Sequence, residues 1–277
     1  MASQQDKAVA FRALHDRPGA FIIPNAWDAG SAKILASLGF EAIATTSQGL
    51  ASSLGIADGT GALRRDDAIA NCRAIAAATD LPVSADLENC YAHDPEAAAQ
   101  TIRLAVEAGV VGVSIEDATG DAAKPIYDFA LAVERVQAAV AAASSMPLPV
   151  VLVARADGLL CGGDLDDAVR RLQAFEKAGA DVLYAPGLRD LASIRQVVKS
   201  VGRPVNVVMS TADPALTLAQ LAEAGVRRIS VGGALSRLAF AGLVRGATEM
   251  RERGTFTWVR EALPTKDLMR ILNRGDT

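Results

Sequence analysis

The chain has 277 residues, of which 51% are hydrophobic, 22% charged and 4% aromatic, and its formal net charge is −4. This length suits one large α/β barrel or two ordinary domains, and the charge and low aromatic content argue against nucleic-acid, base-stacking and anionic-membrane partners. No apolar run reaches the ~20 residues needed to cross a bilayer and no signal peptide is visible, so we expect a cytoplasmic protein.

Short apolar runs alternate with alanine- and leucine-rich stretches along the chain. A leading helix is expected over 5–17. The predicted strands are 21–25, 42–47, 82–88, 111–116, 150–155, 181–185, 204–209 and 228–231. The helices expected after them are 28–39, 66–79, 95–108, 127–143, 164–178, 189–200, 214–223 and 235–253, and a long glycine-containing loop is expected over 48–63.

Eight strand–helix units are the number that closes a (β/α)8 barrel, the TIM barrel of the α/β class. Several runs are continuously apolar, as expected for parallel strands covered on both faces. A doubly wound open sheet is the competing architecture, but no GxGxxG follows the first strand. We therefore predict one barrel domain over 1–253, with the leading helix as a cap. A C-terminal helical tail over 254–277 would contain a short helix at 266–273 and would either pack on another surface, such as a partner subunit, or fray.

Acidic residues end two neighbouring strands of the predicted barrel. Asp86 and Glu88 are two residues apart, so on a strand both would point to one face, and Glu116 ends the next strand. Carboxylates that converge at one barrel mouth repel each other unless a cation lies among them. Oxygen ligands of this kind suit Mg²⁺. The alternative is that these residues are solvated loop acids or helix caps.

Arg155 follows an apolar run, so its charge requires a partner. At a barrel mouth its guanidinium could bind a substrate carboxylate, or it could form a structural ion pair with Asp157 or Glu116. Ser47 and Gly49 after the second strand could supply a hydroxyl and backbone N–H donors to a carboxylate, although both are also common turn residues. We expect His15 to be structural, and His93 either to lie at the surface or to reach the mouth.

Several segments in this order resemble the isocitrate lyase/phosphoenolpyruvate mutase superfamily over nearly the whole chain. The segments are Pro24-Asn25-Ala26-Trp27-Asp28-Ala29, Thr46-Ser47-Gln48-Gly49, Ser53-Leu54-Gly55 with Asp58, Asp86-Leu87-Glu88, Ile115-Glu116-Asp117, Ala154-Arg155-Ala156-Asp157 and Gly179-Ala180-Asp181.

The resemblance implies a (β/α)8 barrel that binds Mg²⁺ and a 2-oxo acid or its enolate. Asp86 is similar to the direct metal ligand of the family, and Glu88 replaces a second acid that holds metal-bound water. Asp58 and Glu116 resemble further members of this shell. The substrate carboxylate would be held by Ser47 with the neighbouring Gln48 and Gly49, and also by Arg155. Family members commonly exchange a C-terminal helix between subunits, which would account for the tail.

The chain departs from the family where reactions are distinguished. Family lyases carry a Lys-Lys/Arg-Cys-Gly-His loop after strand four, but residues 117–125 contain neither Cys nor His. The Lys-Thr-Asn gating segment of phosphonopyruvate-processing members is also missing, although Lys124 could supply a cation. The glutamate usual after strand six is replaced within Tyr184-Ala185-Pro186.

The leading hypothesis is therefore a Mg²⁺-dependent lyase that breaks a C–C bond in a small 2-oxo or 2-hydroxy carboxylic acid. It would resemble an oxaloacetate decarboxylase or a methylisocitrate lyase, with Arg155, Glu116 and Asp58 in the chemistry. Phosphonopyruvate mutase or hydrolase chemistry at a P–C bond is the second hypothesis. A 2-oxo acid-binding protein without turnover is the third. The expected partners are a small carboxylate substrate and identical subunits, in a homodimer or a homotetramer.

Overall fold

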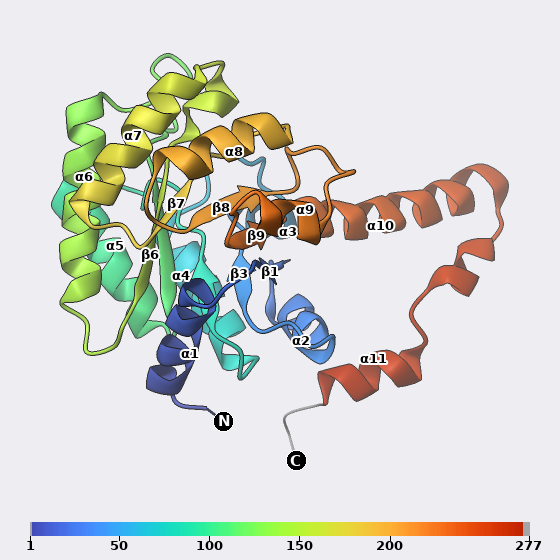
Figure 1. Ribbon diagram of the computed structural model, residues 1–277. Helices are drawn as coiled ribbons and strands as arrows, with labels where there is room; N and C mark the ends of the chain where they lie inside the picture. Colours follow the sequence, from blue (N-terminus) through green and yellow to red (C-terminus); the bar gives the residue numbers. More distant parts are fainter. Residues whose placement is uncertain (1, 274–277) are drawn as a thin grey trace.

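The strands form one parallel sheet that closes almost completely into a barrel (Figure 1). The computed structural model describes residues 2–273. Hydrogen-bonded neighbours follow the order β1-β9-β8-β7-β6-β5-β4-β3-β2. The strands are β1 (Phe21–Ile23), β2 (Asn25–Ala26), β3 (Ile43–Thr45), β4 (Val83–Ala85), β5 (Gly112–Glu116), β6 (Val151–Arg155), β7 (Val182–Tyr184), β8 (Val205–Val208) and β9 (Arg228–Ser230). The predicted α/β barrel is thus confirmed.

The first predicted strand is divided at Pro24. β1 pairs with β9, whereas β2 pairs with β3. Proline has no N–H for the ladder, although the Pro24 carbonyl accepts a hydrogen bond from Ala44 N at 2.9 Å. One stretch of chain therefore joins both edges of the sheet, and nine assigned strands correspond to the eight predicted ones.

The helices surround the strands, apart from the C-terminal ones (Figure 1). They are α1 (Gln4–Asp16), α2 (Ala29–Ser37), α3 (Ser47–Ser53), α4 (Arg65–Ala77), α5 (Pro95–Glu107), α6 (Phe129–Ser144), α7 (Leu165–Ala178), α8 (Leu191–Ser200), α9 (Leu218–Glu223), α10 (Ala234–Arg253) and α11 (Thr265–Leu272), with 3₁₀ helices η1 (Asp157–Cys161) and η2 (Thr257–Glu261). None of those within 2–273 is both long enough and apolar enough to span a membrane.

Three sequence predictions of local structure were wrong. The expected loop 48–63 begins with α3, because the Thr46 hydroxyl caps Gly49 N at 3.3 Å and Leu50 is buried. The helix expected over 214–223 starts only at Leu218, since Thr217 forms a capping box with Gln220. The strand expected over 82–88 ends at Ala85, which changes the geometry of Glu88.

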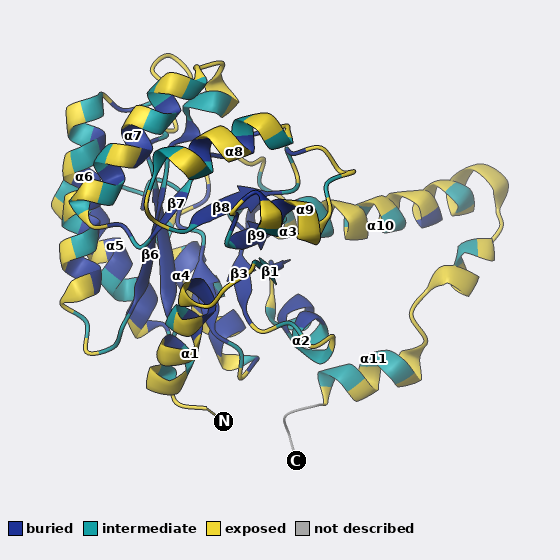
Figure 2. Ribbon diagram, viewed as in Figure 1, coloured by how far each residue is buried: buried dark blue, intermediate teal, exposed yellow. Residues whose placement is uncertain are grey.

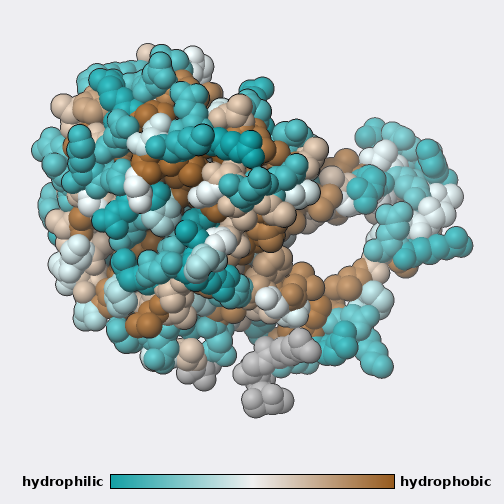
Figure 3. Space-filling view, viewed as in Figure 1, coloured by the Kyte–Doolittle hydropathy of each residue, from teal (hydrophilic) through white to brown (hydrophobic). Residues whose placement is uncertain are grey.

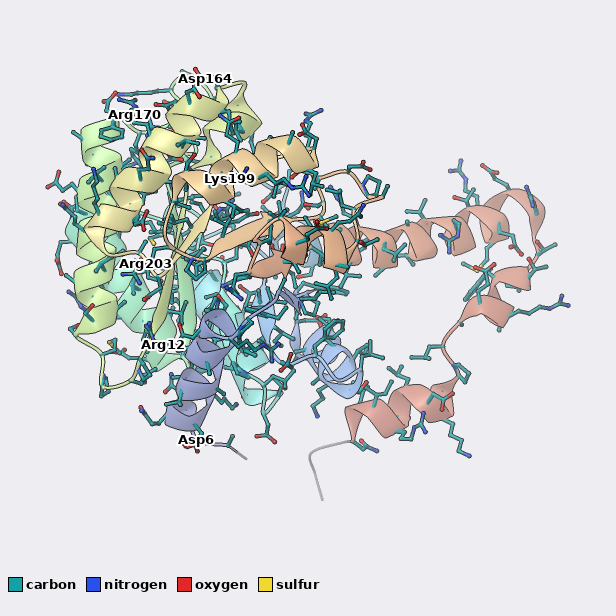
Figure 4. All side chains as sticks on the ribbon, in the orientation of Figure 1. Asp6, Arg12, Asp164, Arg170, Lys199 and Arg203 are labelled. Carbon is teal, nitrogen blue, oxygen red and sulfur yellow. The ribbon has the colours of Figure 1, made fainter. Side chains whose placement is uncertain are left out.

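The barrel has a closed floor and an open mouth. Buried side chains of α1, such as Phe11, pack against Phe21 and Val151 inside the barrel, and Figure 2 shows the strands as buried. Arg12, labelled on α1 in Figure 4, forms an ion pair with Asp181 at 3.0 Å. Asp164, where α7 begins, is labelled at the opposite end of the barrel. The strands end on that side, so the mouth lies there.

The C-terminal helices form an arm beside the barrel (Figure 1). α10 extends away from it, and α11 returns next to α2, where Lys33 Nζ donates to Leu272 O at 2.7 Å. α11 confirms the short helix predicted at 266–273, whereas residues 274–277 lie outside the described residues. Apolar surface is visible along the barrel-facing parts of the arm (Figure 3).

Candidate active site

One guanidinium joins acidic residues from three strand ends. Glu116 and Arg155 are register partners at the ends of β5 and β6. Arg155 Nη1 lies 2.9 Å from Glu116 Oε2 and 2.9 Å from Asp86 Oδ1. Arg155 Nε and Nη2 lie 3.3 Å and 3.0 Å from the two oxygens of Asp157. The structural ion pairs considered from the sequence are therefore present, and Asp86 belongs to the same network.

Burial shapes the electrostatics of this network. The four side chains are between 5% and 20% exposed. Burial opposes the charge of Arg155, but Asp157, Glu116 and Asp86 outweigh it and raise the pKa of Arg155 well above its ordinary value. Burial raises the pKa of Glu116 well above its ordinary range in spite of the arginine. Three carboxyl groups thus share the single positive charge of Arg155.

The turn after β3 brings Ser47 to Asp86. Ser47 N and Ser47 Oγ each donate to Asp86 Oδ2 at 3.0 Å, and Asp86 N donates to Thr45 Oγ1 at 2.8 Å. Gly49 N is used in capping α3. The Gln48 side chain lies across Gly233, where a β-carbon would be only 2.0 Å from Gln48 Oε1. The predicted carboxylate-binding segment, 47–49, is therefore adjacent to Asp86. The donors of Ser47 already bind the Asp86 carboxylate.

Glu88 reaches the cluster through a strained turn rather than through strand alternation. Its φ is 48°, and Cys90 and Tyr91 have φ of 60° and 55°; this left-handed region is unfavourable for such residues. The prediction that Asp86 and Glu88 share a strand face is therefore wrong, because β4 ends at Ala85. Burial, followed by the charges of Asp86 and Asp58, raises the pKa of Glu88 to about 7.

A buried arginine on α6 holds this turn in place. Arg135 is 0% exposed. Its guanidinium donates to the carbonyls of Asn89, Ala92 and His93 at 2.5–2.6 Å and lies 4.3 Å from the centre of the Tyr127 ring. Nothing in the sequence around position 135 indicated this role, because the residue lies within an ordinary amphipathic helix.

Asp58 lies in the exposed loop before α4. Desolvation of its carboxyl group, followed by the charge of Asp86, raises its pKa. The polar groups of Gly59 and Gln48 and the charge of Arg155 oppose this shift. Asp58 is thus electrostatically part of the cluster, although it comes from a different loop.

Asp117 was missed by the sequence analysis as a site residue. Asp117 Oδ1 accepts from Asp157 N at 2.7 Å, and Asp117 Oδ2 from Arg171 Nη1 at 3.1 Å. Burial raises the pKa of Asp117 to about 6, so it remains ionised at neutral pH. It positions Asp157, which in turn orients Arg155. In the sequence, the feature that could have identified Asp117 as a site residue was its position directly after Glu116.

Asn25 links the two ends of the sheet beside the site. Asn25 Nδ2 donates to Thr45 O at 2.7 Å, while Asn25 Oδ1 accepts from the amides of Val231 and Gly232 at 3.0 and 2.9 Å. The residue therefore keeps the segment after β9 close to β3. It lay within one of the recognised sequence segments, but its role required the three-dimensional structure.

The donor set fits a magnesium ion. Within residues 2–273, no three His, Cys, Asp or Glu side chains converge closely enough to enclose a metal ion directly. Mg²⁺ commonly takes one or two protein carboxylates and retains several waters. Asp86, Glu88, Glu116 and Asp58 provide hard oxygen donors, and the raised pKa values of the last three reflect desolvation and mutual repulsion that a cation would relieve.

A cavity of about 760 Å³ opens beside Glu88. Arg64, His93 and Thr119 are among its lining residues, and His93 Nδ1 lies 2.6 Å from Tyr127 Oη. His93 thus lies exposed at the surface and also lines this cavity beside the mouth. Lys124 forms an exposed ion pair with Asp128 at 2.5 Å. Arg64 and Arg65 bring positive charge to the same cavity as Glu88, so it has room and charge for a small polar molecule beside the carboxylate cluster.

Residues 11–251 match the family model described as phosphoenolpyruvate phosphomutase. Among curated relatives, 2-methylisocitrate lyase of Escherichia coli K12 is 30% identical over 272 residues, covering 93% of this chain and 89% of that protein. Oxaloacetate decarboxylase of Pseudomonas savastanoi pv. phaseolicola is 29% identical over 235 residues, covering 82% and 78%.

Solved structures have the same fold. A structure from Burkholderia cenocepacia J2315, provisionally described as a lyase/mutase, is 54% identical, with a TM-score of 0.94 and 96% coverage of both chains. A phosphonopyruvate hydrolase in complex with oxalate and Mg²⁺ is 26% identical, with a TM-score of 0.86 and coverage of 98% of this chain and 95% of that one.

Proposed function

Because the chain belongs to the phosphoenolpyruvate phosphomutase family, we propose that it is a Mg²⁺-dependent lyase that cleaves a C–C bond in a small 2-oxo or 2-hydroxy carboxylic acid through an enolate. The observation that carries this proposal is the bridge from Arg155 Nη1 to both Asp86 and Glu116, 2.9 Å from each. This bridge places the positive charge of Arg155 beside the carboxylates that could bind Mg²⁺. The negative charge of the enolate oxygen would develop in the same place.

Each site residue has a part in this proposal. Asp86 would ligate the metal directly, while Glu88, Glu116 and Asp58 would hold its water ligands. Bound Mg²⁺ would supply Lewis-acid stabilisation of the enolate. Arg155, oriented by Asp157, would bind the substrate and stabilise the same oxygen.

The substrate carboxylate would lie at the N-terminus of α3. Ser47 would donate its hydroxyl and amide, together with the backbone amide of Gln48. The amide of Gly49 would join them after release from the Thr46 hydroxyl. The support for this placement is that Ser47 already presents both donors to a carboxylate, that of Asp86, at 3.0 Å.

Oxaloacetate decarboxylation is the reaction that we favour. Carbon dioxide leaves without protonation, and the resulting pyruvate enolate can take its proton from water, so no loop acid is required for C–C cleavage. The loop after β5 contains no Cys or His, and Lys124 within it is paired with Asp128. The similarity to an oxaloacetate decarboxylase supports this choice.

Phosphonopyruvate chemistry at a P–C bond is the second candidate, supported by the similarity to a phosphonopyruvate hydrolase. A 2-oxo acid-binding protein without turnover is the third. We would follow purified protein by proton and phosphorus NMR with oxaloacetate, 2-methylisocitrate and phosphonopyruvate, each with Mg²⁺ and with EDTA. We expect Mg²⁺-dependent pyruvate from oxaloacetate. Phosphate or phosphoenolpyruvate from phosphonopyruvate would replace our proposal with the second candidate.

Variants at two acids test the metal assignment. Asp86→Asn should abolish Mg²⁺-dependent turnover, whereas Glu107→Gln, on the exposed end of α5, should leave it unchanged. Full activity of Asp86→Asn in EDTA would disprove the metal-dependent mechanism. Tight Mg²⁺-dependent binding of oxalate without any product would instead favour the binding protein.

We also propose that the chain forms a homodimer or homotetramer through its arm. Leu238, Leu243, Val244, Phe256 and Val259 are between 56% and 66% exposed and all belong to the arm, and exposed apolar surface concentrated in one region marks an interaction site. Light scattering with the full chain and with a chain ending at Arg253 tests this proposal. A monomeric full chain at micromolar concentration would contradict it.

A further inference from the structure

Arg228 places a full positive charge inside the barrel. It begins β9 and lies in one register row with Asn206 on β8 and Tyr184 on β7. The residue is 6% exposed, and its guanidinium lies 5.8 Å from the centre of the Phe11 ring, on the helix that covers the barrel floor. Its guanidinium therefore approaches the floor of the interior, although the same register row continues from Tyr184 to Arg155 of the candidate active site.

This charge has no ionic partner among residues 2–273. Arg228 Nη2 donates to Ser84 Oγ at 3.2 Å, but Nε and Nη1 have no hydrogen-bond partner there. Asp86 is the only carboxylate that acts on it appreciably, and Asp86 is already bound to Arg155 and Ser47. Burial lowers the pKa of Arg228 to about 10, so it stays protonated at neutral pH.

The guanidinium lines a small cavity that is rich in hydrogen-bond donors. The cavity measures about 50 Å³, and its lining includes Ser84, Ser114, Ser230 and Asn206 together with Asp86 and Arg155 of the candidate active site. Each of these hydroxyl oxygens already accepts one hydrogen bond: Ser84 from Arg228, Ser114 from Leu87 N and Ser230 from Asn206 Nδ2. Within residues 2–273 their O–H groups donate no hydrogen bond to the protein, so they can donate to an occupant of the cavity.

Charge distinguishes a small anion from water as the occupant. Water alone would satisfy the unpaired N–H groups, but the guanidinium would then have only the charge of Asp86, which lines the same cavity and is shared with Arg155. A buried charge without a partner of its own is unfavourable. About 15 Å³ is enough for one water-sized particle, so the cavity has room for an ion and a neighbouring water. Such a water would also satisfy Asn206 Oδ1, which is buried and has no partner within the described chain.

We propose that the barrel interior contains a binding site for one monovalent anion of halide size, held by Arg228 and by the serine hydroxyls of β4, β5 and β9. The anion neutralises the guanidinium and stabilises the folded barrel. The site adjoins the candidate active site, because Asp86 and Arg155 line the same cavity, but it does not depend on which substrate the protein uses.

Bromide is the direct probe. Crystals of the wild-type protein grown with bromide in place of chloride should give an anomalous peak within hydrogen-bond distance of Arg228 Nε or Nη1. A cavity that contains only water in such crystals would overturn the proposal. This measurement needs no variant, so it stands even if substitutions at position 228 prevent folding.

Thermal unfolding tests the energetic role. Sodium chloride is titrated at constant ionic strength against sodium gluconate, whose anion is too large for the cavity. We expect Tm to rise by about 3 °C for each tenfold increase in chloride above the dissociation constant. Arg228→Met should lose this dependence, and it should fold, because an apolar replacement of a buried charge is often tolerated.

Arg227→Met is the matched control. The neighbouring Arg227 donates to the carbonyls of Arg17 and Gly19 rather than to a group of the interior cavity. Its variant should keep the chloride dependence of the wild type. An equal dependence of Tm on chloride in the two variants would also overturn the proposal, as would a wild-type Tm that does not depend on chloride.

Discussion

Glu116 and Arg155 end adjacent strands as direct register partners, and Arg155 Nη1 lies 2.9 Å from Glu116 Oε2. Parallel pairing of β5 with β6 fixes this relationship, so it does not depend on a flexible loop. Asp157, two residues after Arg155, holds the other edge of the guanidinium. The position of the positive charge is therefore determined by the backbone of the barrel and by one neighbouring carboxylate.

We predict that Arg155→Lys retains the fold but loses most of the activity. A lysine ammonium cannot reproduce two hydrogen bonds to Asp157 together with a bridge to Asp86 and Glu116. Loss of one donor to developing negative charge lowers kcat by about 10²–10³-fold, and we expect a loss of this size. Steady-state kinetics with the substrate identified by NMR measures it. Arg170→Lys, whose side chain is 60% exposed, is the control, and similar kinetics for both variants would refute the role of Arg155.

Asp117→Asn should strongly destabilise the protein. Asp117 is 1% exposed and pairs with Arg171, and removal of one partner of a buried pair costs about 3–5 kcal/mol. Arg171 keeps Asp167 as a partner and burial disfavours the Asp117 charge, so we expect a loss at the lower end of this range. The asparagine can still accept from Asp157 N, so the variant mainly removes the charge. Urea unfolding gives the free energy of unfolding.

Asp167→Asn provides the comparison, because Asp167 pairs with the same arginine but is 34% exposed. Partly exposed pairs contribute about 0–1 kcal/mol, so this variant should unfold at nearly the wild-type urea concentration. Equal losses at positions 117 and 167 would show that burial does not control the strength of the Arg171 interactions.

Much of this architecture was predictable, because strand–helix periodicity and strand-end chemistry are local properties of the sequence. Glu116 and Arg155 are strand-end residues that interrupt apolar runs, and the structure brings them together. Asp86 was correctly expected to lie with them. The role of each residue in binding metal or substrate stays a prediction.

The missed features depend on contacts between distant segments. The left-handed turn at Glu88 is held by Arg135, 47 positions later in the sequence. Arg227 and Arg228 are adjacent and identical in type, and only one of them lies within the barrel. Alternation along a strand places neighbouring side chains on opposite faces, but does not say which face is inside. Only the closed sheet distinguishes the two arginines.

Stability should fall with acid partly because of His15. Burial, followed by the charge of Arg228, lowers the pKa of His15 from 6.5 to about 3. Between these values the unfolded chain binds a proton that the folded chain does not. The stabilisation is therefore complete above pH 6.5 and is lost as pH falls towards 3, by about 1.4 kcal/mol per pH unit.

His15→Gln isolates this effect from the titration of carboxylates. Urea unfolding of both proteins between pH 6.5 and 4.5 should show that the wild type loses about 2–3 kcal/mol more than the variant. Parallel loss in the two proteins would mean that His15 accepts a proton in the folded state, and that its burial beside Phe11 and Phe21 does not exclude the charge.

Gly112→Ala should destabilise the barrel floor through overpacking. A β-carbon at Gly112 would lie 2.5 Å from Phe11 Cε1 and 2.9 Å from Ser84 Oγ. Phe11 cannot retreat easily, because it is 0% exposed and packs inside the barrel. Overpacking of this kind costs about 1–3 kcal/mol, which urea unfolding would detect. Gly242→Ala is the matched control, since no atom lies within 4 Å of its β-carbon position on α10, and this variant should gain about 0.4–1 kcal/mol. A neutral effect at position 112 would mean that α1 can move away from the sheet, and that the barrel floor is less tightly closed than the contacts of Phe11 indicate.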